Sequence, residues 1–157
     1  MSPLRYPISG GRRATLLACA LAGALWVGGC GMQPMSPIAK PMTASLSGAS
    51  EVPAVMGPAT GSVDASLNSA TNLLTWTVTY SGLSGPATAG HFHGPALAGE
   101  NAGVLVPLSG SLASPIVGSA TLTPAQATDL MAGRWYLNLH TAAYPGGEIR
   151  GQLKPLP

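Results

Sequence analysis

Apolar and polar side chains alternate along several short stretches of this chain. The clearest stretch runs from Leu74 to Tyr80, where Leu74, Trp76 and Val78 alternate with threonines. Successive side chains of a strand point to opposite faces, so this pattern predicts a half-buried β-strand. Residues 61–67 alternate in the same way, and the polar segment 68–72 has the composition of a turn. Together the two stretches predict a β-hairpin with Trp76 in the core.

Further short apolar stretches are separated by turns rich in Gly and Pro, and they predict more strands. We expect these strands at residues 43–46, 91–93, 103–108, 116–122, 135–140 and 149–153. One helix is expected from Pro124 to about Ala132, because Thr123 suits an N-cap, Gln126 completes a capping box and Gly133 follows. Seven or eight short strands with one short helix predict an all-β fold, an immunoglobulin-like or Greek-key β-sandwich.

The last two predicted strands define a register. The odd-numbered residues of 135–139 and of 149–153 are Trp, Leu, Leu, Ile, Gly and Leu, which suit the core. An antiparallel pairing that buries both sets places Leu139 opposite Ile149, His140 opposite Glu148 and Asn138 opposite Arg150. A register shifted by one residue would turn Arg150 toward the core, so the shifted register is disfavoured. Trp135 is therefore predicted to be a second core tryptophan.

The amino terminus has the pattern of an export signal. Arg5, Arg12 and Arg13 precede an uncharged apolar stretch, residues 14–29, which ends in small residues before Cys30. This order resembles a bacterial lipobox, so we expect residues 1–29 to be removed and Cys30 to carry the lipid. The alternative is an ordinary secretory signal that contains a cysteine. The Arg12–Arg13 pair leaves the export route, Sec or Tat, open.

Removal of the signal defines the remaining organisation. Residues 30–42 are rich in proline and predict an extended tether, and residues 43–157 are expected to form one domain. The domain would then be anchored in the bacterial cell envelope, at the outer membrane or in the periplasm of a Gram-negative cell. The remaining chain has four basic and five acidic residues, and it has no basic patch. We therefore expect no nucleic-acid partner.

The three histidines are the main candidates for chemistry. His91 and His93 lie two residues apart on one predicted strand and so share a face. The apolar alternation around Leu139 places His140 on the outer face of its own strand. Three imidazoles that meet would suit copper or zinc, and Glu148 would hold His140 from behind. The alternative is that these three outward-facing histidines are structural, because spacing alone does not show that the two strands adjoin.

Four segments together resemble a known family. They are Ala44–Pro53, His91–Pro95, Leu139–Thr141 and Gly146–Leu153, in this order. They are similar to the CHRD domain, a module named for its repeats in chordin that also occurs singly in bacterial secreted proteins. The resemblance covers about residues 42–154 and implies an immunoglobulin-like β-sandwich, but it implies little about activity. The residues that match the family's motifs are Glu51, Pro53, Gly94, Pro95, Gly147, Arg150 and Gly151; we interpret Glu51 and Arg150 as a structural ion pair.

Two functions remain open. No nucleophile motif, phosphate-binding loop or paired carboxylate is present in the sequence, which favours a non-enzymatic module. Such a module would bind an envelope protein or polysaccharide. The alternative is a copper or zinc protein that uses His91, His93 and His140, with mononuclear redox activity left open. Copper-zinc superoxide dismutase has the same sandwich architecture, but its two-metal site needs more histidines than this chain has.

Overall fold

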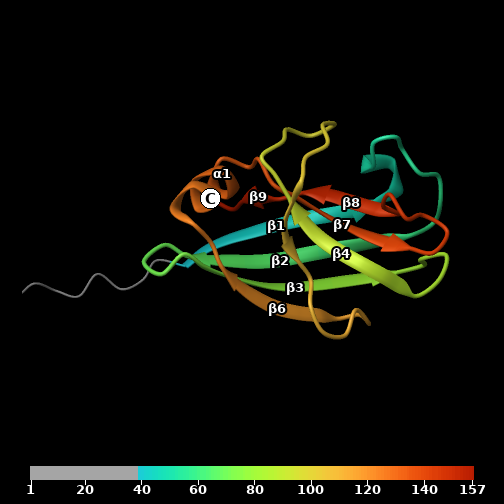
Figure 1. Ribbon diagram of the computed structural model, residues 1–157, viewed down its shortest axis with the longest axis horizontal. Helices are drawn as coiled ribbons and strands as arrows, with labels where there is room; N and C mark the ends of the chain where they lie inside the picture. The colour runs from blue at the N-terminus through green and yellow to red at the C-terminus, as the bar shows by residue number, and fades with distance from the viewer. Residues whose placement is uncertain (1–38) are drawn as a thin grey trace, which may run out of the picture. The chain divides into compact units, whose positions relative to one another are not determined.

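The computed structural model describes residues 39–157 as nine β-strands and one short α-helix. Figure 1 labels most of them. The strands are β1 (Ala39–Ser47), β2 (Thr60–Asn68), β3 (Leu73–Ser81), β4 (Ala87–His93), β5 (Val104–Pro107), β6 (Ile116–Thr121), β7 (Tyr136–Thr141), β8 (Ile149–Gln152) and β9 (Lys154–Pro155). The helix is α1 (Pro124–Met131), and a single 3-10 turn, η1 (Gly48–Ser50), follows β1. The predicted all-β class is confirmed.

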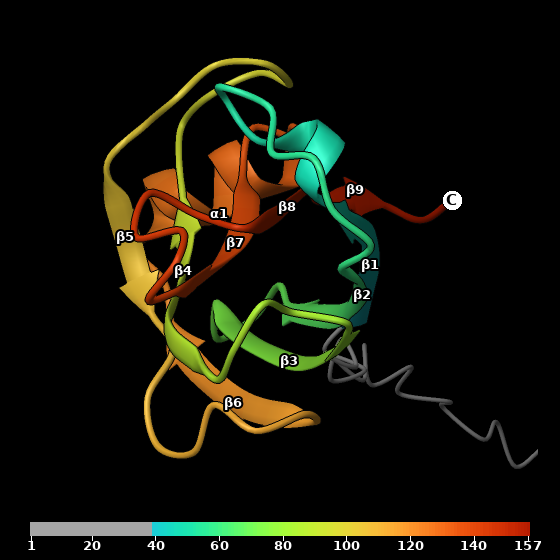
Figure 2. The same cartoon turned by 90° about the vertical axis from the view of Figure 1, so that its right-hand side faces the viewer.

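The strands follow one antiparallel path in the order β5-β4-β7-β8-β1-β2-β3-β6, with β9 paired to β1. Four strands lie on each side of the β8–β1 contact, where a single residue pair, Ser47 and Arg150, connects them. Figure 2 shows how the strands encircle the interior, so that the sheet is nearly closed. The result is a sandwich of two four-stranded layers that share one edge.

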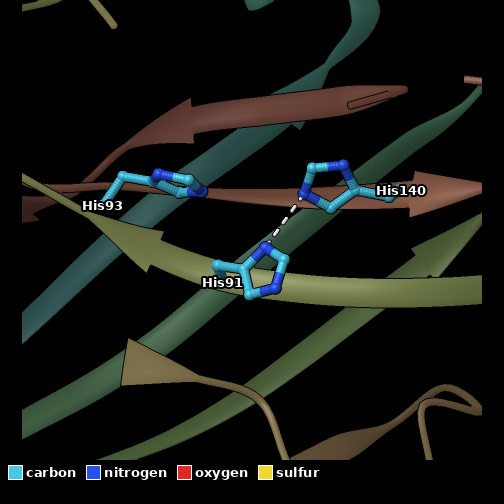
Figure 3. A group of neighbouring side chains, drawn as sticks. All are labelled: His91, His93 and His140. Atoms are coloured by element: carbon cyan, nitrogen blue, oxygen red, sulfur yellow. Dashed lines mark hydrogen bonds between the residues drawn. The ribbon is translucent and has the colours of Figure 1, made fainter. Parts of the chain in front are cut away.

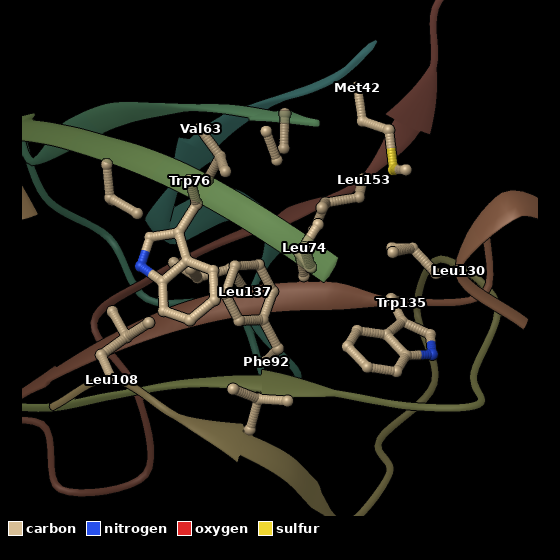
Figure 4. Packing of buried hydrophobic residues seen from close by; sticks show 14 of the residues in the cluster. Met42, Val63, Leu74, Trp76, Phe92, Leu108, Leu130, Trp135, Leu137 and Leu153 are labelled. Atoms are coloured by element: carbon tan, nitrogen blue, oxygen red, sulfur yellow. The ribbon is translucent and has the colours of Figure 1, made fainter. Parts of the chain in front are cut away.

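The interior is filled by the alternating apolar residues. Trp76 and Trp135 are 4% and 0% exposed, and they come from opposite layers. Phe92 lies between them, with ring centroids 5.0 Å from Trp76 and 6.3 Å from Trp135. Figure 4 shows these rings among the surrounding aliphatic side chains. The prediction that both tryptophans are core residues is confirmed, and Phe92 connects the layer of β4 to the layer of β3.

The hairpin and the helix agree with their sequence signals. β2 and β3 pair along their whole length, with Ala65 opposite Trp76. Thr123 caps α1 by accepting from the Gln126 backbone N–H, while the Gln126 side chain accepts from the Thr123 N–H. The chain turns out of the helix at Gly133, whose φ of +68° favours glycine.

The first strand begins earlier than the sequence predicts. β1 starts at Ala39 rather than residue 43, and Met42 is 1% exposed and pairs with Ala65. Pro41 makes this segment resemble a tether, but a proline near the start of a strand is tolerated. Residues 39–42 therefore belong to the domain. The predicted signal 1–29, the lipid site Cys30 and the tether residues 30–38 lie outside the described residues. Within residues 39–157, no helix has the length and apolar character needed to span a membrane.

The predicted register of the last strands is also confirmed. Leu139 lies opposite Ile149 and Asn138 opposite Arg150. Gly151 faces β1 at the shared edge, where a Cβ atom would overlap the Ser45 carbonyl oxygen. Because the backbones of β8 and β1 approach so closely here, only glycine fits without a shift of one strand. This contact fixes β8, and so β7, relative to the rest of the sheet.

Candidate metal centre

The three histidines converge. β4 and β7 are antiparallel neighbours, with His91 opposite Asn138 and Ala89 opposite His140. This pairing brings all three imidazoles to the same face of the two strands, and one nitrogen of each lies within 4.8 Å of the others. Figure 3 shows the rings directed toward a common point, with His91 Nδ1 3.0 Å from His140 Nε2. The adjacency that the sequence leaves open is therefore present.

The outer face that carries the histidines is largely closed to solvent. His93 and His140 are only 8% and 9% exposed, and His91 is half-buried. The reason is that loops fold back over the outer face of β4 and β7. The loop after β4 places Ala102 against His93, and the loop after β7 places Pro145 against His140. His91 is the most accessible of the three rings.

Two backbone carbonyls fix the histidine tautomers. His93 Nδ1 lies 2.9 Å from the Ala102 oxygen, and His140 Nδ1 lies 2.9 Å from the Pro145 oxygen. A carbonyl only accepts, so each Nδ1 must carry the hydrogen. Each neutral ring then has its lone pair on Nε2. Metal-binding histidines are commonly oriented in this way by a backbone carbonyl behind the ring.

The site favours neutral imidazole. Burial lowers the pKa of His91, and the neighbouring His140 and His93 lower it further. Burial also lowers the pKa of His140; the hydrogen bond to Pro145 opposes that effect, and His93 adds to it. Only the neutral ring can offer a lone pair to a metal. These two rings therefore stay available for a metal at a more acidic pH than an exposed histidine would.

The predicted contact between Glu148 and His140 is wrong. The Glu148 carboxylate accepts instead from Ser84, at 2.7 Å from both its backbone N and its Oγ, and from Thr141 Oγ1 at 2.6 Å. Although the register is as predicted, Glu148 precedes β8 and turns toward the loop between β3 and β4. Burial raises the pKa of Glu148, but the hydrogen bonds from Thr141 and Ser84 outweigh burial and leave the pKa lowered.

The predicted ion pair between Glu51 and Arg150 is also wrong. The one salt bridge within residues 39–157 joins Arg134 and Asp129. The Arg150 guanidinium is 2% exposed, donates to Asn101 Oδ1 at 2.9 Å and to the Glu100 carbonyl, and lies 3.3 Å from the Tyr136 ring centroid. Arg150 therefore holds the loop over the site, and it stacks on the ring that stacks on His93.

Glu51 lies near the histidines on the far side of Asn138. Burial raises its pKa to about 7, and the Arg150 charge, the Val52 N–H and the Asn138 side chain oppose that rise. Asn138 lies beside the carboxyl without a well-formed hydrogen bond to Oε1. Gly147, with φ +127°, lies against both groups; a Cβ there would overlap Glu51 and come within 2.7 Å of Asn138 Nδ2.

The opposite pKa shifts of Glu51 and Glu148 give a pH test. Because the pKa of Glu51 is raised in the folded protein, the stabilisation from its protonated carboxyl is fully present below about pH 4.5. That stabilisation is lost as the pH rises toward about 7. We expect Glu51→Gln to gain stability relative to wild type over that range. The lowered pKa of Glu148 has the opposite sign, so Glu148→Gln should be least stable relative to wild type above pH 4.5 and recover toward acid. Denaturant midpoints from pH 3 to 8, with a chelator present, measure both. If the stability difference from wild type changed with pH in the same direction for both variants, the opposite pKa shifts would be contradicted.

The remaining motif residues lie in loops and at strand edges. Pro53 and Pro95 follow cis peptide bonds in the loops after η1 and β4. Gly94 follows β4 and lies beside the Trp135 indole, where a Cβ would come within 2.7 Å of the ring. Together with Gly147, Arg150 and Gly151, these residues shape loops and strand edges of the domain.

Two residues of the site are missing from the sequence-based set. Asn138 Oδ1 lies 3.1 Å from His93 Nε2 and 3.0 Å from His140 Nε2. Tyr136 stacks on His93 with centroids 4.8 Å apart and planes 2° apart, and its hydroxyl accepts from the Ala102 N–H at 3.2 Å. The alternation that places His91 and His93 on one face also places Tyr136, Asn138 and His140 on one face, so the signal for both is present in the sequence.

A nearly closed antiparallel sandwich with histidines from two adjacent strands is thus the frame of this protein. The family model of the CHRD domain matches residues 42–153, so the chain belongs to the CHRD family. Neither the curated proteins nor the solved structures that we compared with the chain gave a match.

Proposed function

We propose that this CHRD domain binds one copper or zinc ion through His91, His93 and His140. The observation that carries the proposal is the convergence of three imidazole nitrogens within 4.8 Å, two of them oriented by backbone carbonyls. A first-row metal needs nitrogen ligands at about 2.0–2.1 Å. Binding would therefore draw the three nitrogens, which now lie within 4.8 Å of one another, toward one point.

The donor set favours copper and zinc over harder ions. All three histidine donors are neutral nitrogens, which suit copper and zinc, whereas magnesium and calcium need several oxygen ligands. The two nearest carboxylates do not face these nitrogens: Glu148 is held by Ser84 and Thr141, and Glu51 lies beyond Asn138. The proposal is for a binding module, and it assigns no reaction to the site.

We further propose that the domain acts from the bacterial cell envelope, anchored by lipid on Cys30. The basic start, the apolar segment and the small residues before the cysteine support this. From that position the domain would bind metal. Its loops would also bind a macromolecular partner, either an envelope protein or a polysaccharide. Mass spectrometry of the mature amino terminus should find Cys30 as the first residue with attached acyl chains. An unmodified Cys30, or a different first residue, would contradict the anchor.

A titration tests the metal proposal. The protein is purified without a histidine tag, stripped with a chelator and titrated with Zn(II) and, separately, with Cu(II). We expect one ion per chain for either metal. Binding no stronger than that of the urea-unfolded chain at the same pH and metal concentration would contradict the proposal. The interpretation as a binding module that works without metal would then remain.

A further inference from the structure

Asn138 is the polar group most directly placed between the histidines. It lies on β7, two residues before His140 and so on the same face, and it is opposite His91 across the β4–β7 pairing. The side chain is 4% exposed, and its Oδ1 faces the Nε2 atoms of His93 and His140 at 3.1 and 3.0 Å.

These three atoms form an unusual contact. The carbonyls of Ala102 and Pro145 require the hydrogen on Nδ1 of each ring, so both Nε2 atoms are lone-pair acceptors. Asn138 Oδ1 is an acceptor as well. Acceptors that face one another in a buried site repel, unless a cation lies among them or one of them carries a proton. Without a cation, a half turn of the amide relieves the repulsion, because Nδ2 then donates a hydrogen to His93 Nε2, while His140 Nε2 accepts from His91 Nδ1–H; both orientations fill the same space.

We propose that Asn138 Oδ1 is a fourth ligand of the metal site and that the amide turns over between the metal-free and metal-bound forms. The inference rests on the proposed function. A tetrahedral site with bonds of about 2.0–2.1 Å separates neighbouring ligand atoms by about 3.3 Å. The separations of His140 Nε2 from Asn138 Oδ1 and from His91 Nδ1 are both 3.0 Å, and that of His93 Nε2 from Asn138 Oδ1 is 3.1 Å. These three separations are close to the spacing that one ion requires, and the three histidine nitrogens as a group lie within 4.8 Å of one another.

The surroundings permit the turn. At its other end the amide lies beside the Glu51 carboxyl. Gly147 lies against both groups, and a side chain there would overlap Glu51 and crowd Asn138. Glycine at position 147 therefore leaves room for the amide in either orientation.

Two substitutions separate a ligand from a structural residue. Asn138→Leu keeps the approximate volume without an oxygen, and we expect about a 10-fold weaker Zn(II) affinity. Asn138→Asp offers a stronger oxygen ligand that needs no half turn, and we expect about a 10-fold tighter affinity. The control is Asn101→Asp, which adds the same charge on the adjoining loop, where Asn101 contacts Arg150 and the Val52 carbonyl rather than a histidine. Co(II) loading of each variant reports the ligand set, because the visible spectrum changes when an oxygen ligand is lost, whereas a purely structural change leaves it unaltered.

The outcomes distinguish this inference from the proposed function. If the wild type binds no ion, both fail. If the wild type binds but Asn138→Leu binds as tightly or more tightly, with an unchanged Co(II) spectrum, the fourth ligand is excluded and the three-histidine site stands. An Asn138→Asp variant no tighter than Asn101→Asp would exclude it as well. Chemical unfolding of the metal-free variants confirms that each is folded before titration.

Discussion

Replacing Trp135 with alanine should lower the free energy of unfolding by about 3–5 kcal/mol. The side chain is 0% exposed and lies in the layer that carries the histidines, next to Phe92. Its indole nitrogen has no hydrogen-bond partner in residues 39–157, so the loss comes from burial and from the cavity that remains. A loss of this size is a large share of the total stability of about 5–15 kcal/mol that a typical domain has.

The measurement is the denaturant midpoint of the metal-free protein, with Val117→Ala as the control. Val117 is 69% exposed on β6, and its truncation should change the free energy of unfolding by less than about 0.5 kcal/mol. Trp76→Ala should resemble Trp135→Ala, because Trp76 packs on the other side of Phe92. A Trp135→Ala protein that unfolds at the wild-type midpoint would contradict this core.

Replacing His93 with alanine should weaken Zn(II) or Cu(II) binding by at least about 100-fold. Changes to groups that merely orient a metal ligand cost about 10–100-fold, so loss of a buried ligand should cost at least as much as the upper end of that range. The side chain is 8% exposed and its Nδ1 is already held by the Ala102 carbonyl, which leaves Nε2 in place to bind. The metal-free variant loses the hydrogen bond to Ala102 and the contact with Asn138, each worth about 0.5–1.5 kcal/mol, and should still fold.

Glu148→Gln is the matched control for that titration. Glu148 lies close to His140 in sequence and register, but its carboxylate contacts Ser84 and Thr141. We expect the affinity of this variant to stay within a few-fold of wild type. If Glu148→Gln weakened binding as much as His93→Ala, the metal would lie elsewhere or Glu148 would bind it directly.

Strong alternation made most of the fold predictable from the sequence. The hairpin around Trp76 follows from the alternation of apolar and polar side chains. The pairing of Leu139 with Ile149 follows from the same alternation and from the cost of burying Arg150 in the core. The start of β1 does not follow, because Pro41 and its neighbours have the local composition of a tether. The burial of Met42 is decided by distant residues in β2 and β9, which local sequence does not reveal.

The three histidines of the candidate site were predictable from the sequence, but their surroundings were not. Alternation places His91 and His93 together, and it gives His140 the equivalent face. Whether β4 and β7 adjoin depends on sheet order, which is a property of the whole topology. The two wrong contacts, Glu148 with His140 and Glu51 with Arg150, have one cause. Loops cover the outer face, and their carbonyls supply the partners that the sequence pattern assigns to side chains.

X-ray absorption of the zinc-loaded, tag-free protein tests the central claim most directly, because it reports the ligands of the ion itself. The account predicts one zinc site with three imidazoles at about 2.0–2.1 Å and one further light-atom ligand. It also predicts that the imidazole signal falls by one ring in His93→Ala. A zinc environment of oxygen atoms without an imidazole signal, or one unchanged in His93→Ala, would contradict a metal centre at these three histidines.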